Sequence, residues 1–283
     1  MEKTLFEYEL LDFGDQKRLE KFGETIVERP APQAIWEPEN KKVWESATAV
    51  CEREGKNNTW TKNSAFPDPW QIKFKNLTLE LRASSQHQVG IFPEQLDNWE
   101  WIEDKIKAAK RPLNILNLFA YTGVATLAAS SAADNVKVCH VDGAKSAINW
   151  AKKNAELSGL QDNPIRWICD DVIKFVTREV KRGRKYDGII LDPPAFGRGP
   201  GGEWKINRDL PILLDLLSQL ISDKPLFVIL SCHAQDYLAQ DLLDILETNF
   251  NFEIKDKEAF DLSIPAATKE DFYLSICGRI ASV

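Results

Sequence analysis

The sequence predicts an α/β protein, with a mostly parallel sheet covered by helices on both faces and a small β-rich region before it. Two observations predict this class. From residue 111 onward, short apolar runs alternate with amphipathic segments of helical period, and such alternation calls for parallel strands joined by helices. Before residue 111, tryptophans and prolines separate short runs that alternate like strands. We therefore expect a β-rich region at residues 1–110 and an α/β domain at residues 111–283.

The α/β part contains five strand–helix pairs in regular order. The expected strands are Ile115–Leu118, Val136–Val141, Ile165–Ile168, Gly188–Leu191 and Leu226–Leu230. The expected helices are Val124–Ser131, Ser146–Leu157, Val172–Val180, Leu210–Ile221 and Asp236–Thr248. Two closing strands are expected near Phe252–Lys255 and Phe272–Cys277. Because a loop and not a helix separates them, we expect a seven-stranded sheet with one antiparallel strand at an edge.

The β-rich part has fewer signals. Residues Trp70–Leu81 alternate apolar and polar side chains at period two, which predicts β structure. Six of the nine tryptophans precede residue 111. They could stack on nucleic-acid bases, but we expect them to form the core of this small region.

Composition limits the possible functions. The 36 basic and 43 acidic side chains give a net charge of -7. A negative protein does not bind nucleic acid through its overall charge, so any RNA contact must come from a local basic surface. The basic cluster Lys181–Lys185 precedes the fourth strand, at the end of the sheet away from the expected site, and is interpreted as a solvated turn. Five scattered cysteines without CxxC pairs suggest neither a disulfide framework nor a zinc site. With no signal peptide and no apolar run near 18 residues, we expect a cytoplasmic protein.

The residues that follow the strands predict a ligand site, because ligands of open α/β sheets bind at the carboxyl ends of the strands. After the first strand only Gly123 allows close backbone approach, and the G-x-G-x-x-G pattern of dinucleotide sites is absent, so the ligand need not carry phosphate. Asp142 follows the second strand, where a carboxylate accepts hydrogen bonds from ribose hydroxyls; the alternative is a helix cap. Asp170 and Asp171 follow the third strand. One of them could accept the amino group of adenine, and we favour Asp171, although either could cap the next helix.

The fourth strand ends at Asp192, Pro193 and Pro194. Two prolines fix φ twice and remove two backbone donors, so the carbonyls just before them must find partners outside the sheet ladder. The loop then continues through Phe196. The segment after it is interpreted as a mobile lid, with glycines and three larger side chains: Gly197, Gly199, Gly201, Gly202, Arg198, Trp204 and Lys205.

Four segments together carry a resemblance to a known family. NLFAYTG, VDGAKSAINWAKKNAELSGL, ICDDVIKF and LDPPAFGRG resemble the motifs of class I S-adenosylmethionine-dependent methyltransferases, and are most similar to the branch of bacterial large-subunit ribosomal RNA methyltransferases. The resemblance covers roughly Val89–Ala234. QVGIFPEQ, Gln88–Gln95, is similar to the segment that in this branch leads into the fold and covers the cofactor. Members of this branch often carry an N-terminal RNA-binding domain, which residues 1–110 do not obviously resemble.

The resemblance implies a Rossmann-like methyltransferase fold, S-adenosylmethionine as cofactor and no metal. Residues 1–110 would then cover the cofactor and contribute substrate contacts. The cofactor-binding residues that it implies are Phe92, Gln95, Asn117, Phe119, Ala120, Tyr121, Thr122, Gly123, Asp142, Gly143, Ala144, Asp170, Asp171 and Asp192. The candidate catalytic residues are Asp192, Pro193, Phe196 and Cys232.

The reaction chemistry depends on Cys232. Its thiolate could attack C6 of a pyrimidine, as in the 5-methylcytosine enzymes that this branch includes; the alternative is a small thiol packed after a core strand. His233, which has no partner in sequence, is interpreted as a surface histidine.

Three functions follow. The leading one is methylation of a ribosomal RNA base. The second is methylation of a small molecule or protein, and the third is a noncatalytic nucleotide-binding module.

Overall fold

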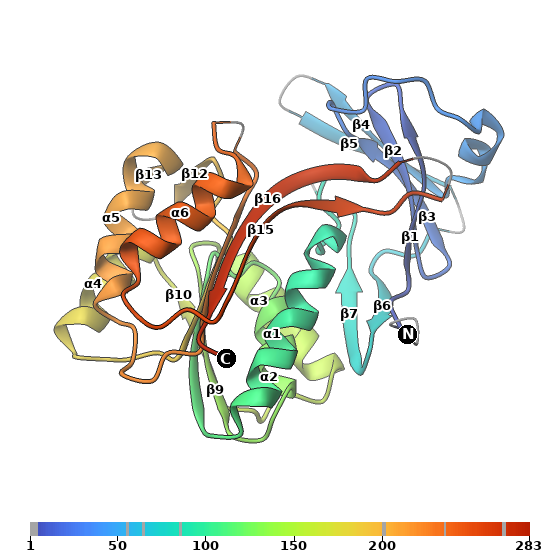
Figure 1. The fold of residues 1–283 in the computed structure, drawn as a ribbon. Coiled ribbons are helices and arrows are strands. Elements are labelled where there is room, and N and C mark those ends of the chain that lie inside the picture. The colour runs from blue at the N-terminus through green and yellow to red at the C-terminus, as the bar shows by residue number, and fades with distance from the viewer. Residues whose placement is uncertain are drawn as a thin grey trace. The chain divides into compact units, whose positions relative to one another are not determined.

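The computed structural model describes residues 5–283 apart from 55–56, 64–65, 85–86, 200–201, 235 and 268–269. The chain forms two compact units (Figure 1). Unit 1 is Met1–Pro93 with Ser263–Tyr273, and unit 2 is Glu94–Leu262 with Leu274–Val283. The division therefore falls at residue 93, not at the expected residue 110. The reason is that helix α1 (Leu96–Ala109) buries Ile102 and Ile106 in the core of unit 2.

Unit 2 is built on a seven-stranded sheet. Its strands are β8 (Leu113–Leu118), β9 (Val136–Asp142), β10 (Ile165–Cys169), β11 (Gly188–Leu191), β14 (Phe227–Cys232), β15 (Asp256–Ile264) and β16 (Phe272–Ala281). They lie in the order β10-β9-β8-β11-β14-β16-β15. The first five in this order are parallel, and β16 runs antiparallel to β14. The strand order reverses between β8 and β11, so a ligand crevice is expected at their carboxyl ends.

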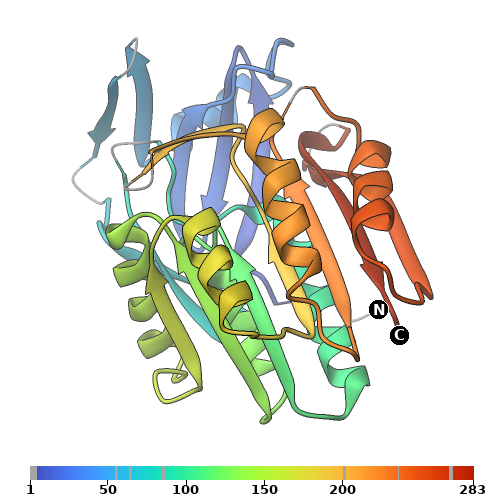
Figure 2. The same ribbon diagram turned by 90° about the vertical axis from the view of Figure 1, so that its left-hand side faces the viewer.

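Helices cover both faces of this sheet. They are α1, α2 (Val124–Ser131) and α3 (Lys145–Leu157) on one face, and α4 (Val172–Lys181), α5 (Ile206–Ser218) and α6 (Ala239–Asn249) on the other (Figures 1 and 2). Each helix buries one apolar stripe. Phe175 and Val176 of α4 and Leu213 and Leu217 of α5, for example, are at most 1% exposed. The predicted α/β class is confirmed.

Three details of unit 2 differ from expectation. The antiparallel strand β16 lies inside the edge, between β14 and β15, because it pairs with β14 from Phe227 to Cys232. No strand forms at Phe252–Lys255; β15 begins at Asp256. Helix α5 begins at Ile206 and not at Leu210, so Pro211 lies inside the helix rather than at its start.

Unit 1 contains a five-stranded sheet in the order β1-β2-β3-β4-β5, formed by Tyr8–Gly14, Lys17–Phe22, Thr25–Pro30, Ala49–Glu54 and Asn57–Lys62. A separate pair, β6 (Trp70–Phe74) and β7 (Leu77–Leu81), forms from the period-two segment, which turns at Lys75. Short 3-10 helices span Lys41–Ser46 (η1) and Pro93–Gln95 (η2).

The tryptophans do not form the core of unit 1, and that expectation was wrong. Trp36 is 58% exposed, whereas Trp70 is buried. Two of the six early tryptophans, Trp99 and Trp101, belong to α1 in unit 2. The core is built instead by aliphatic residues and phenylalanine, because the alternating positions of the strands carry them: Leu10, Leu19, Phe22, Val27, Ile72, Phe74 and Leu79.

Within the described part of the chain, no helix is both long and apolar enough to span a membrane.

Candidate functional site

The loop between β8 and α2 has an unusual backbone. Phe119 and Tyr121 adopt left-handed φ angles of 56° and 48°, and Gly123 has φ 89°. Non-glycine residues in this region cost energy and cluster at ligand sites. A Cβ on Gly123 would lie 2.9 Å from Cβ of Ala151 in α3. Gly123 is therefore required both for its φ angle and for the close approach of α3.

Asp142 joins this loop to the next one. Its Oδ2 accepts a hydrogen bond from the Tyr121 amide at 2.9 Å, and its Oδ1 accepts one from the Ala144 amide at 2.8 Å. Burial raises the pKa of the Asp142 carboxyl, and these two bonds offset part of that rise. Each carboxylate oxygen can accept a further hydrogen bond. The carboxylate is thus fixed at the end of β9 with acceptor capacity for two hydroxyls of one ligand.

Asp170 and Asp171 both have partners within the protein. Asp171 is the N-cap of α4, and its Oδ1 accepts from the Lys174 amide at 2.9 Å. Asp170 pairs with Arg178 and accepts from the Asp171 amide at 2.8 Å. The capping alternative therefore holds for Asp171, and an adenine contact by either residue stays a prediction.

Two other predicted cofactor contacts lie beneath the loop. Asn117 is 2% exposed, and its amide donates to Oγ1 of Thr126 at 2.9 Å; that hydroxyl lies 2.9 Å from Nδ1 of His140. Thr122 is 1% exposed, and its carbonyl accepts from the Asn154 side chain at 2.9 Å. Asn117 and Thr122 therefore support the loop from inside the protein.

Asp192 follows β11 and meets polar groups from two other segments. The Ser231 hydroxyl donates to its Oδ1 at 2.8 Å, and Nε2 of Gln95 lies 3.4 Å from its Oδ2. Burial raises the pKa of the Asp192 carboxyl, and the nearby His233 and the Ser231 hydrogen bond offset only part of that rise. Gln95 and Asp192 thus lie together, and their contact with the cofactor stays a prediction. Phe92 belongs to unit 1, so its contact with the cofactor stays a prediction.

The carbonyls of Pro194 and Ala195, at the end of the DPP segment, accept hydrogen bonds from the hairpin that follows and from the start of α5. This hairpin is formed by β12 (Phe196–Gly199) and β13 (Gly202–Lys205); Gly201 lies outside the described residues. Nε1 of Trp204 donates to the Pro194 carbonyl at 2.7 Å, and the Ile206 amide donates to the Ala195 carbonyl at 3.1 Å. The Trp204 ring also meets Phe119 edge-on, with centroids 4.8 Å apart. The loop is therefore held from both sides, while movement of the hairpin as a lid stays a prediction.

Phe196, the first residue of β12, is exposed to solvent. It is 51% exposed, and the Arg198 guanidinium lies 5.7 Å from its ring centroid. An exposed aromatic ring with a cation beside it is a surface on which a nucleic-acid base can stack.

Cys232 and His233 end β14 but differ in environment. Cys232 is 0% exposed, and burial raises the pKa of its thiol. His233 is exposed; its Nδ1 lies 3.0 Å from the Leu274 carbonyl, and its Nε2 lies 3.6 Å from Oε1 of Glu94. His233 is thus a surface histidine, as interpreted from the sequence, and its structural partner Glu94 is far from it in the chain.

A cavity of about 530 Å³ opens beside this loop. Its lining combines polar and apolar residues from the DPP loop, the start of α5 and the end of β14: Ala195, Lys205, Ile206, Asn207, Arg208, His233, Ala234 and Asp236. The basic cluster Lys181–Lys185 is exposed and precedes β11, at the opposite end of the strand from Asp192. Within the described residues, no group of three His, Cys, Asp or Glu side chains could hold a metal ion.

The chain matches known proteins over most of its length. The family described as S-adenosylmethionine-dependent methyltransferase matches residues 52–251. A SAM-dependent methyltransferase from Agrobacterium tumefaciens, known as a crystal structure, has a TM-score of 0.92 to this chain at 35% identity, covering 98% of this chain and 91% of that one.

Two curated relatives also match. Ribosomal RNA large subunit methyltransferase I of Aeromonas salmonicida is 29% identical over 246 residues, 84% of this chain and 61% of the relative. Ribosomal RNA large subunit methyltransferase K/L of Shewanella frigidimarina is 33% identical over 164 residues, 57% of this chain and 21% of the relative. This chain thus spans less than two thirds of either relative.

The geometry fits the cofactor of this family. The cradle around Gly123 has no glycine-rich phosphate loop, and the fixed Asp142 carboxylate suits a ribose diol. The predicted Rossmann-like methyltransferase fold and the predicted cofactor, S-adenosylmethionine, are confirmed by these matches. The chain belongs to the S-adenosylmethionine-dependent methyltransferase family.

Proposed function

We propose that this protein transfers the methyl group of S-adenosylmethionine to a base of ribosomal RNA in the cytoplasm. One observation carries the proposal: the buried Asp192 carboxylate and the exposed Phe196 ring lie on either side of Ala195, which lines a cavity of about 530 Å³. The names of the curated relatives support the choice of ribosomal RNA.

The loops after β8 and β9 would hold the cofactor. Asp142 would accept the ribose hydroxyls, and the backbone at Gly123 would allow the adenosine to approach. S-adenosylmethionine, when bound, supplies a methyl group attached to a sulfonium. The thioether that leaves is neutral, so the leaving group needs no further activation. The protein must then chiefly orient the acceptor and exclude water.

The loop after β11 would orient the acceptor. Asp192 would accept an N–H of the target base, while Phe196 stacks on a base that is single-stranded or flipped out. The burial of Cys232 favours direct attack by a ring nitrogen or exocyclic amine over covalent addition of a thiolate. The nitrogen lone pair would form the new N–C bond as the S–C bond breaks, and the proton on nitrogen would leave through Asp192 to water.

A second candidate substrate is a small molecule or a protein. The net charge of -7 favours it, because RNA-binding proteins are commonly basic. The rigid DPP loop argues against a noncatalytic binding module, which would not need to orient an acceptor.

Incorporation of radiolabelled methyl groups tests these alternatives. The protein is incubated with labelled S-adenosylmethionine and, separately, with unmodified large-subunit ribosomal RNA, a metabolite extract and a protein extract. We expect label in the RNA. Label only in the metabolite or protein fraction would overturn the RNA proposal, and label in none of the fractions would speak against the activity.

Replacement of Asp142 tests the cofactor site. Asp142→Ala should weaken S-adenosylmethionine binding by about 2 kcal/mol, roughly 30-fold, because a charged acceptor is lost. Calorimetry measures this change. Asp134→Ala is the matched control, because Asp134 is exposed and precedes the same strand at its other end. Equal affinities in the two variants would remove Asp142 from the ribose site.

A further inference from the structure

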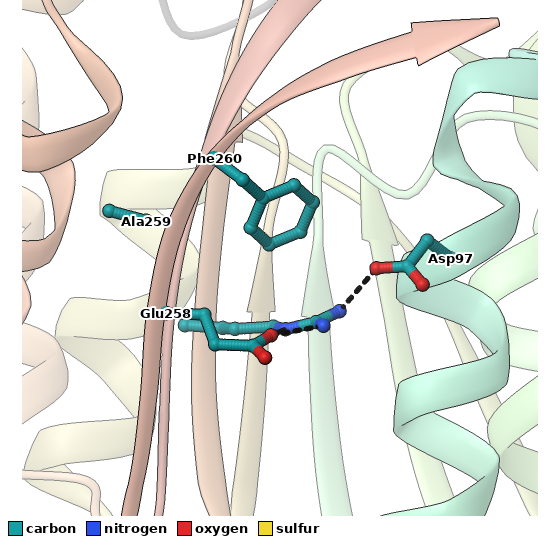
Figure 3. A pocket seen from close by; sticks show the side chains of 5 residues that line it. Asp97, Glu258, Ala259 and Phe260 are labelled. Atoms are coloured by element: carbon teal, nitrogen blue, oxygen red, sulfur yellow. Dashed lines mark hydrogen bonds and ion pairs between the residues drawn. The ribbon is translucent and has the colours of Figure 1, made fainter.

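Arg279 of β16 lies in an unusual setting for a cation. Its side chain is 8% exposed, and its guanidinium lies 5.0 Å from the ring centroid of Trp101 and 4.6 Å from that of Phe260. On one side it donates to Glu258 at 2.6 Å and to Asp97 at 2.9 Å. Figure 3 shows these two carboxylates and Phe260 around a cavity of about 450 Å³. The outer end of Arg279 is thus neutralised by acidic residues at this cavity.

Nη1 of Arg279, which also donates to Asp97, begins a chain of hydrogen bonds. Nη1 of Arg279 donates to Oδ1 of Asn98 at 3.3 Å, and Nδ2 of Asn98 donates to Oε1 of Gln95 at 2.7 Å. Nε2 of Gln95 donates to the Ser231 hydroxyl at 3.0 Å, and that hydroxyl donates to Asp192 at 2.8 Å. The chain therefore runs without interruption from a cation on β16 to the carboxylate of the DPP loop.

The donor at one end fixes the direction of every link. A guanidinium has only donors, so Asn98 must turn its oxygen toward Arg279 and its NH₂ group toward Gln95. Gln95 must then present its own NH₂ group to Ser231, which leaves the serine proton for Asp192. Reversing either amide would place donors against donors in a buried site, because Asn98 and Gln95 are 2% and 7% exposed.

We propose that Arg279, Asn98 and Gln95 are positioning residues, which orient the Ser231 and Gln95 donors so that the Asp192 carboxylate is held in one rotamer toward the acceptor. The role in catalysis rests on the proposed function, whereas the chain itself does not. One other group acts on Asp192: His233, on the β14 side, lowers the pKa of its carboxyl against the larger rise caused by burial.

The experiment cuts the chain at its middle, away from the reacting atoms. Asn98→Ala removes both links without adding charge, and Asn98→Asp keeps the shape and the bond from Arg279 but has no N–H for Gln95. Asp104→Asn is the control, because Asp104 is exposed on the same helix. The carboxyl of Asp192 is titrated by NMR in protein with ¹³C-labelled aspartate, without substrate, and its signal is assigned from Asp192→Asn.

Both Asn98 variants should raise the Asp192 pKa by on the order of one unit, since a hydrogen bond to a charged group is weakened. Asp104→Asn should leave it unchanged. A folded Asn98→Ala protein with an unshifted Asp192 pKa would overturn the proposal. This holds even if Asn98→Asp shifts the pKa, because the added negative charge would then be the cause. If Asn98→Ala does not fold, Asn98→Ser, which leaves a smaller void, takes its place.

Kinetics then separate this proposal from the proposed function. With an RNA substrate, both Asn98 variants should lower kcat about tenfold and leave cofactor affinity unchanged, and their pH profile should move upward with the Asp192 pKa. If neither the wild-type protein nor any variant methylates RNA, the proposed function fails. The titration still decides whether the hydrogen-bond chain from Arg279 orients Asp192.

Discussion

Strand β11 carries an aspartate at each end, Asp187 before Gly188 and Asp192 after Leu191. Asp187 lies 3.0 Å from Nη1 of Arg111, and it also accepts from the Ser222 hydroxyl at 2.8 Å and from the Asn114 amide at 2.8 Å. A cation thus touches this carboxylate directly. These contacts join the starts of two neighbouring strands and the segment after α5.

Asp192 accepts from neutral groups, Ser231 and Gln95. The guanidinium of Arg279 reaches it only indirectly, through Asn98 and Gln95 and, by one route, through Ser231 as well. The comparison teaches that β11 uses one residue type for two purposes. At the amino end the carboxylate accepts three hydrogen bonds, one of them from a cation, and is structural. At the carboxyl end it accepts only from neutral groups and keeps capacity for a ligand.

The largest expected effect comes from Asp192→Asn. Methyl transfer should fall by about 10²–10³-fold, the scale for losing one electrostatic contact to a reacting group. Stability should not fall, because an amide removes the cost of burying a charge. Single-turnover rates and urea denaturation measure the two effects. A variant with most of its activity would remove Asp192 from the acceptor site.

Asp187→Asn should show the opposite pattern. Breaking the pair with Arg111 should lower the free energy of unfolding by about 2 kcal/mol, because a partly buried guanidinium loses its counter-charge. The folded fraction should keep its methylation rate. If Asp187→Asn impairs the rate as strongly as Asp192→Asn, the division of purposes between the two ends of β11 is wrong.

The sequence predicts the parts of the site that are local in the chain. Gly123, Asp142 and the DPP loop each stand at the end of an apolar run, so strand periodicity is enough to place them at one edge of the sheet. The same reasoning predicts strand and helix order but mistakes β15, because Phe252–Lys255 also contains alternating apolar residues.

The parts that join distant segments are not predictable in this way. Gln95 and Ser231 are 136 residues apart, and Asn98 and Arg279 are 181 apart. No local pattern records such pairing, which follows from the insertion of β16 beside β14 and the packing of α1. The contact between His233 and Glu94 could not be predicted either, because the two residues are far apart in the sequence.

The stability of the protein should depend on pH through the carboxyl of Asp192. Burial raises the pKa of Asp192 above the unfolded value of about 3.9. The unfolded chain then loses this proton at lower pH than the folded protein, so the contribution of Asp192 to stability is fullest below pH ~3.9 and is lost as pH rises through the folded pKa.

Activity should change in the other direction. If the ionised carboxylate orients the acceptor, the methylation rate should increase as pH rises through the raised pKa, and Asp192→Asn should lack this limb. Stopped assays across the acid range measure the profile, with Asp187→Asn as the control that keeps the limb. An identical acid limb in Asp192→Asn would assign it to another group.

The smallest effect is expected at Cys232, the neighbour of Ser231 on β14. Its thiol is fully buried and its pKa is raised, whereas a thiolate nucleophile needs a lowered pKa and access to the base. Cys232→Ser should therefore change the methylation rate by less than about threefold and lower stability by about 1 kcal/mol, since a hydroxyl replaces an apolar thiol. A 5-fluoropyrimidine RNA should trap no covalent adduct. An inactive Cys232→Ser protein together with a trapped wild-type adduct would show that the target is pyrimidine C5, and that β14, not the end of β11, supplies the decisive group.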